Sequence, residues 1–229
     1  MSRRNKLQKF NELLSNPLVY ENFNTADATL HWNTQDQVIR KGCWNTEHFH
    51  NALPITLELA CGGGEYTVAL AKANPERNFI GIDIKGARIW KGATQALDEQ
   101  LTNVAFLRTR IEIIEQFFGE NEVDEIWITF PDPFLRESKS NKRLTSPPFL
   151  ERYRKILKPN AIVHLKTDSP ELYDFTMETL QSDPRSKIIY NNADIYAGPL
   201  LDDALLIKTK YELMHLAVGK TIKYIRFSL

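Results

Sequence analysis

Five apolar, β-rich runs follow one another through the middle of this chain, and the stretches between them carry the 3.6-residue spacing of amphipathic helices. In one such stretch Tyr66, Leu70 and Ala73 share a face, and Pro75 ends the run. Strands that alternate with helices predict a parallel sheet with helices on both faces. The predicted strands are Ile55 to Leu59, Phe79 to Ile84, Val104 to Leu107, Glu125 to Phe130 and Ala161 to Leu165, and Lys187 to Tyr190 and Thr221 to Phe227 add two more.

Residues 1 to 52 lack this regular pattern, apart from a short basic helix predicted at Lys6 to Leu14. We therefore predict a partly helical N-terminal extension over residues 1–52 and one α/β domain over residues 53–229. With 42% apolar residues, a chain of 229 residues can bury a substantial core. No apolar run is long enough for a membrane span and no secretory signal is present, so we expect a cytoplasmic protein, either a monomer or a homodimer.

A glycine-rich turn follows the first predicted strand, where Gly62, Gly63 and Gly64 open a helix. Asp83 ends the next strand and can accept hydrogen bonds from both hydroxyls of a ribose. A dinucleotide fingerprint would place glycine where Thr67 stands, and Glu58 would repel a pyrophosphate. A cofactor with ammonium and sulfonium charges suits two carboxylates better, so the pattern favours S-adenosyl-L-methionine.

The fourth predicted strand runs directly into Pro131-Asp132-Pro133-Phe134. Ligands of open α/β sheets bind outside the carboxyl ends of the strands, so Asp132 is the candidate catalytic residue.

Basic residues are concentrated after this motif, although the whole chain has 29 basic and 29 acidic residues. From Arg136 to Lys158 the sequence holds eight basic and two acidic residues, which favours a local docking surface for a polyanion. Most charge runs are merely solvated surface, so this observation does not decide the matter alone. The expected RNA contacts are Lys139, Lys142 and Arg143, and the N-terminal Arg3, Arg4, Lys6 and Lys9 could extend them.

Taken in order, these motifs resemble the bacterial tRNA (guanine-N(7)-)-methyltransferases. The shared features end with Thr167-Asp168 and Thr209-Lys210-Tyr211-Glu212, and the likeness covers about residues 55 to 229. The resemblance implies a Rossmann-like class I methyltransferase fold, a seven-stranded sheet whose last strand is antiparallel. It also implies methyl transfer from S-adenosyl-L-methionine to N7 of a guanine in the variable loop of tRNA. Alanine at position 60 replaces the usual glycine.

The resemblance also implies roles for individual residues. Arg110 stands where the family usually has Asp or Asn, beside the adenine of the cofactor. The implied cofactor-binding residues are Glu58, Gly62, Gly64, Asp83, Arg110 and Asp132. The implied substrate-binding residues are Arg136, Asp168, Thr209, Lys210, Tyr211 and Glu212. For a guanine substrate, the Asp132 carboxylate could accept from the N1 and amino hydrogens, Phe134 could stack on the base and Arg136 could donate to O6.

The sequence is also compatible with other functions. The chain could be a class I methyltransferase for another RNA base, a protein side chain or a small amine. A nucleotide-cofactor oxidoreductase and a non-catalytic tRNA-binding protein are alternatives of other classes. His48 and His50 have a spacing that can chelate, but no third ligand accompanies them, so we expect no metal.

Overall fold

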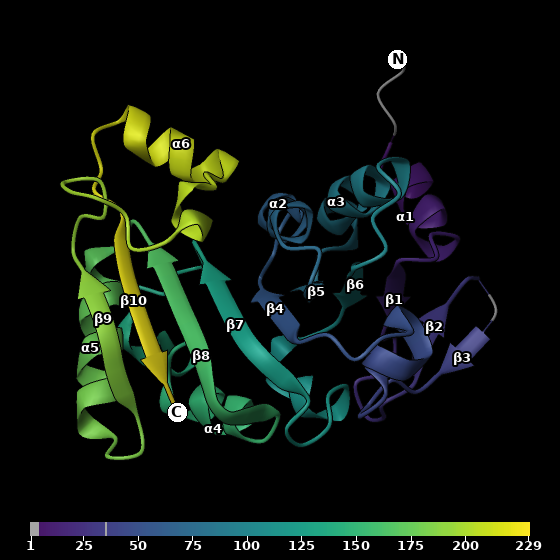
Figure 1. Cartoon of the computed structure of the whole chain (residues 1–229), viewed down its shortest axis with the longest axis horizontal. Coiled ribbons are helices and arrows are strands. Elements are labelled where there is room, and N and C mark those ends of the chain that lie inside the picture. Colours follow the sequence, from purple (N-terminus) through teal and green to yellow (C-terminus); the bar gives the residue numbers. More distant parts are fainter. Residues whose placement is uncertain (1–4, 35) are drawn as a thin grey trace.

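The computed structural model describes residues 5–34 and 36–229, which form one ten-stranded sheet (Figure 1). The predicted Arg3 and Arg4 contacts lie outside the described residues. The strand order is β3-β2-β1-β6-β5-β4-β7-β8-β10-β9. The strands are β1 (Val19–Glu21), β2 (Leu30–Trp32), β3 (Asp36–Val38), β4 (Ile55–Leu59), β5 (Asn78–Asp83), β6 (Val104–Arg108), β7 (Val123–Thr129), β8 (Leu157–Thr167), β9 (Lys187–Asn192) and β10 (Lys223–Ser228).

Seven of these strands are the predicted ones, and five of them, β6, β5, β4, β7 and β8, are parallel neighbours. The last strand, β10, is antiparallel to both β8 and β9, as expected. The predicted count of seven is wrong because β1, β2 and β3 extend the sheet beyond β6, with β1 parallel to β6. Each of the three is only three residues long, too short to show an alternating pattern in the sequence.

The helices α1 (Lys6–Leu14), α2 (Glu65–Ala73) and α3 (Gly86–Asp98) pack on one face of the sheet. The helices α4 (Pro147–Arg154) and α5 (Pro170–Ser182) pack on the other. Successive strand residues point to opposite faces, so along β6 Val104 and Phe106 enter the first core and Ala105 and Leu107 the second. The sheet therefore has a separate apolar core on each face.

Short helical segments complete the chain: η1 (Asn45–Phe49), η2 (Ile111–Gln116), η3 (Glu137–Lys142) and η4 (Asp203–Leu206). The last helix, α6 (Lys210–Ala217), lies above the arrowheads of β7 and β8 in Figure 1. The carboxyl ends of the parallel strands, where ligands of such sheets bind, lie below α6, so this helix is placed to border a ligand site.

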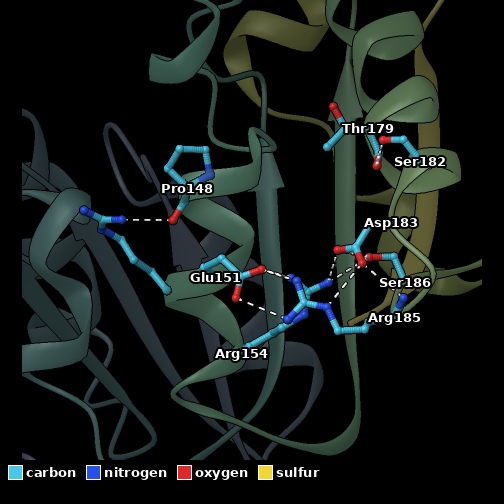
Figure 2. Close-up of polar contacts among 9 residues, drawn as sticks. Pro148, Glu151, Arg154, Thr179, Ser182, Asp183, Arg185 and Ser186 are labelled. Carbon is cyan, nitrogen blue, oxygen red and sulfur yellow. Dashed lines mark hydrogen bonds and ion pairs between the residues drawn. The ribbon is translucent and has the colours of Figure 1, made fainter.

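A charged network links α4 to the turn after α5, and Figure 2 shows the Glu151 carboxylate facing the guanidinium groups of both Arg154 and Arg185. Arg154 also pairs with Asp183 at 2.5 Å and donates to the Ser186 hydroxyl at 3.0 Å. None of these residues lines the cleft described next, so the network contributes to the scaffold.

Candidate active site

A cleft of about 1650 Å³ lies at the carboxyl ends of β4, β5, β7 and β8. Pockets for a single small molecule are usually about 300–1000 Å³, so this cleft has room for a cofactor and a second ligand. The structure brings together ten of the predicted site residues in its lining: Glu58, Gly62, Asp83, Arg110, Asp132, Lys142, Asp168, Thr209, Lys210 and Tyr211. The other five, Gly64, Arg136, Lys139, Arg143 and Glu212, do not line it.

The glycine turn between β4 and α2 gives the cleft a floor without side chains. Gly62 has a φ of +56° and nothing closer than 4.0 Å to the position of a side chain. Gly64 serves packing, because a Cβ there would lie 2.6 Å from the Phe106 ring. Ala60 also has a positive φ, +58°, a conformation that glycine adopts more readily. A glycine at this family position would therefore fit the observed backbone.

Asp83 connects the glycine turn to the start of α3. Its Oδ2 accepts from the Gly62 amide at 3.0 Å, and its Oδ1 accepts from the Lys85 amide at 2.7 Å. An ionised carboxylate has about four acceptor positions, so each oxygen can accept one more hydrogen bond from a ligand. The side chain is thus held in place by the protein and remains able to bind hydroxyl groups.

Glu58 is the second acid of the cleft and is only 3% exposed. Its Oε1 accepts from the Thr129 hydroxyl at 2.6 Å, and its Oε2 accepts from the amide and hydroxyl of Thr67. Burial raises the pKa of Glu58 to about 7, although these hydrogen bonds oppose the shift. A cation in the cleft would favour the ionised form, so this carboxyl is suited to a positively charged ligand.

Asp132 follows β7 and is exposed at the edge of the cleft. Among the described residues, no group donates a hydrogen bond to its carboxylate. The loop around it is unusual, because Phe130 and Phe134 both have a positive φ, +48° and +42°. Such conformations are rare outside glycine and persist where surrounding contacts hold them.

Arg143 supplies those contacts. Its Nε and one terminal nitrogen donate to the carbonyls of Pro133 and Phe134, each at 3.1 Å. The guanidinium also lies over the Phe175 ring, 4.3 Å from its centroid. Because Arg143 is buried, its guanidinium is directed to the loop and not to the surface. Arg136, directly before η3, and Lys139, within η3, are exposed and lie outside the cleft lining.

The helix α6 and the end of β8 form the opposite wall. Asp168 faces α6, with the Lys220 ammonium at 2.5 Å and the His215 Nδ1 at 3.3 Å from its carboxylate. Thr209 caps α6 by accepting from the Glu212 amide at 3.1 Å. The Lys210 amide donates to Glu65 of α2 at 3.1 Å, which joins this wall to the glycine turn.

The two remaining residues of the Thr-Lys-Tyr-Glu motif point in opposite directions. Tyr211 is 49% exposed and lines the cleft. Glu212 is fully buried, pairs with Lys166 at 2.9 Å and accepts from the Tyr196 hydroxyl at 2.6 Å.

Lys9 of α1, which was predicted to extend the RNA contacts, lines the cleft. Lys85, Arg88 and Lys91 also line it, but the sequence analysis did not predict them. The signal that would have found them is their position just after β5. Residues there must lie at the same edge of the sheet as Asp83.

Several other reactive residue types have structural roles. The His164 ring is buried between Glu125 and Tyr224, with hydrogen bonds of 2.8 and 2.6 Å, so both of its nitrogens have partners. Burial raises the pKa of the Cys61 thiol well above its usual value. His48 bonds Tyr20, whereas His50 bonds a backbone carbonyl. Over residues 5–34 and 36–229 we find neither a cluster of three or more potential metal ligands nor a helix suited to crossing a membrane.

Comparison with known proteins identifies the family. A family model described as a putative methyltransferase matches residues 52–225. A tRNA (guanine-N(7)-)-methyltransferase of Bacteroides thetaiotaomicron is 48% identical over 99% of this chain and 86% of its own length. One of Christiangramia forsetii is 46% identical over the full length of both proteins. The chain belongs to the tRNA (guanine-N(7)-)-methyltransferase family.

Solved structures support the fold of this family member. The 16S rRNA methyltransferase KamB superposes with a TM-score of 0.61 over 84% of this chain and 95% of its own, at 14% sequence identity. A mutant 16S rRNA (adenine(1408)-N(1))-methyltransferase from Catenulisporales acidiphilia, with the cosubstrate SAM, gives a TM-score of 0.52 at 15% identity over 84% of this chain and 92% of its own. At such identities the likeness concerns the fold alone, and it confirms the predicted class I methyltransferase architecture.

Proposed function

We propose that this protein transfers the methyl group of S-adenosyl-L-methionine to N7 of a guanine in tRNA. One observation carries the proposal: a single cleft holds the buried acids Glu58 and Asp83 together with the exposed Asp132. Membership of the tRNA (guanine-N(7)-)-methyltransferase family supports the same reaction. The variable loop of tRNA as the target position remains a prediction from that resemblance.

The cleft fits this cofactor on chemical grounds. Glu58 would lie near the positive charges of the cofactor, and Asp83 would accept from the ribose hydroxyls with its free acceptor positions. Gly62 leaves room for the ligand to approach the backbone. Arg110 lines the same part of the cleft and would contact the adenine side. When bound, the cofactor supplies an electrophilic methyl group on a sulfonium.

The residues of the protein then have a positioning task. Guanine N7 carries a lone pair and no proton, so no general base is needed to create the nucleophile. Asp132 would accept from the N1 and amino hydrogens of the base, and its unpaired carboxylate is available for this. Its charge would also offset the positive charge on the methylated base. Correct orientation of two reactants can lower a barrier by about 7–11 kcal/mol.

Two predicted contact residues take supporting roles in this proposal. Arg143 would hold the Pro133 and Phe134 carbonyls, and so the direction of Asp132, instead of binding phosphate. Glu212 would fix α6, while Thr209, Lys210, Tyr211 and Asp168 remain in reach of the substrate.

Two basic surfaces border the cleft and would bind the tRNA backbone. One contains Arg136, Lys139 and Lys142 on and before η3. The other contains Lys85 directly before α3, Arg88 on α3 and Lys9 on α1. The side chain of Lys6 lies outside the described part of the structure. We propose that an RNA helix spans both, which places the target base between them.

Incubation of purified protein with methyl-labelled cofactor and unmodified tRNA, followed by nucleoside analysis, tests the proposal. We expect 7-methylguanosine; label on another base, or none, would contradict the assignment. Asp132→Ala and Asp132→Asn should lose turnover by about 100-fold or more, and their cofactor affinity, measured in parallel, shows whether Asp132 also contacts the cofactor as the resemblance implies. Asp174→Asn, an exposed position on α5, is the matched control. The division at residue 52, the cytoplasmic location and the oligomeric state remain predictions.

A further inference from the structure

A buried lysine lies behind the wall that α6 forms. Lys166 belongs to β8, and its side chain is 0% exposed. Its ammonium donates to the carbonyls of Leu205 and Ile207 at 3.3 and 3.1 Å and lies 2.9 Å from the Glu212 carboxylate. The two carbonyls accept hydrogen bonds from the ammonium, and the Glu212 carboxylate forms an ion pair with it.

All three partners of the ammonium belong to the segment that carries α6. Leu205 is in η4, Ile207 follows it, and Glu212 is in the first turn of α6. The same segment is held at two further points: the Tyr196 hydroxyl donates to Glu212 at 2.6 Å, and the Tyr66 hydroxyl donates to the Ala204 carbonyl at 2.9 Å. Lys166 is thus the centre of the contacts that connect this segment to the sheet.

The backbone of Lys166 reaches the other wall of the cleft. Its carbonyl accepts from the Phe130 amide at 2.8 Å, directly before the loop that carries Asp132. Lys166 also directly precedes Thr167 and Asp168 at the end of β8. One residue therefore contacts the strand end that leads to Asp132 and the helix that carries Tyr211.

We propose that Lys166 is a positioning residue for the target base, which sets the distance between the Asp132 loop and the cleft-lining face of α6 by binding Leu205, Ile207 and Glu212. This inference rests on the proposed function. A buried ion pair is a costly way to stabilise a fold, because well-packed apolar residues of similar size often do as well or better. The pair is better explained by the fixed geometry that it imposes on α6.

The test compares Lys166→Met with the double variant Lys166→Met/Glu212→Gln. The single variant leaves the Glu212 charge buried and unpaired, which destabilises the fold. The double variant removes both charges, and the amide oxygen can still accept from Tyr196. It lacks the donors to Leu205 and Ile207, so we expect kcat/KM for tRNA to remain about 10- to 100-fold below wild type. Affinity for S-adenosyl-L-methionine should stay within about twofold, because Glu58 and Asp83 are intact.

A second readout needs no substrate. Lys208, Lys210 and Lys220 lie in or beside α6, so tryptic cleavage there reports how firmly the helix is held. We expect cleavage at these sites to accelerate in both variants. Thr176→Val is the control for loss of stability alone, since it removes a buried hydroxyl contact with Thr145 on the opposite face of the sheet.

The outcomes separate the two proposals. If the wild type does not methylate tRNA, the proposed function fails. If the wild type is active and the double variant has wild-type kcat/KM and wild-type cleavage, the role of Lys166 is refuted. A loss that Thr176→Val reproduces at equal melting temperature would also refute it.

Discussion

Replacement of Glu58 by glutamine should change how the stability of the protein depends on pH. The pKa of Glu58 rises from an ordinary 4.5 to about 7 on folding, because the carboxyl is buried. Between these values the unfolded chain loses its proton while the folded protein keeps it. The free energy of unfolding of the wild type must therefore fall as pH rises from 4.5 through 7. At about 1.4 kcal/mol per pH unit, the fall amounts to about 3 kcal/mol.

The glutamine variant lacks this titration and retains the shape of the side chain. Its amide oxygen can accept from the Thr67 amide and hydroxyl, and its NH₂ can donate to the Thr129 hydroxyl. Urea unfolding at half-unit steps from pH 5 to 9 gives the free energy of unfolding of both proteins. Every other titrating group contributes to both, so the difference between them isolates Glu58.

We expect the wild type to lose about 2.5 kcal/mol relative to the variant between pH 5 and pH 9, with most of the change complete by pH 8. If the free energy of unfolding depends on pH in the same way in both proteins, Glu58 is not buried in its protonated form. The same residue should make the affinity for S-adenosyl-L-methionine increase with pH up to about 7, because the ionised form favours a cation. Calorimetric titrations at several pH values measure that increase, which the glutamine variant should lack.

Three further predictions follow from the backbone and the charges. Ala60→Gly should relieve about 1–2 kcal/mol of backbone strain, while the greater freedom of glycine in the unfolded chain costs about 0.4–1 kcal/mol. Calorimetry should therefore show a rise in melting temperature of about 1–3 °C, and a fall would contradict the strain. Arg143→Met should lower the free energy of unfolding in urea by about 2 kcal/mol or more, and should reduce turnover while cofactor affinity stays unchanged. Full turnover would show that Arg143 does not support the Asp132 loop. Lys85→Glu/Arg88→Glu should reduce the slope of log affinity for tRNA against log salt concentration by about 2, measured by filter binding. The control is Lys41→Glu/Lys187→Glu, two exposed lysines away from the cleft, and an equal effect of that pair would show that the surface is not specific.

The sequence predicted the strands that carry the site because each is an apolar run followed by polar residues, glycine or proline. Ile55 to Leu59 is β4 to the residue, and the acid after the second run, Asp83, lies where it was expected. The three N-terminal strands were missed because β-pairing, and not local pattern, defines strands of three residues. Only β1 pairs with β6, which is distant in the sequence, and β2 and β3 pair within the N-terminal segment.

Residue type predicted which residues belong to the site region better than it predicted which way their side chains point. A motif does not say which of its side chains face inward, and for Glu212 and Arg143 the neighbours decide this. Glu212 is turned toward a lysine 46 positions away, and Arg143 toward carbonyls of the loop it was expected to accompany. Lys166 carried no signal at all, since a lysine within an apolar strand has no recognised pattern until its three partners are known.

The parallel pairing of β1 with β6 affects how this enzyme can be shortened for experiments. A protein reduced to the residues that the family model matches, 52–225, would leave the Val104–Arg108 edge without its neighbour and uncover the face of α3 that α1 occupies. Unprotected edges of this kind pair with other molecules, so such a truncated protein should self-associate. Crystallisation and binding studies should therefore keep the first 51 residues.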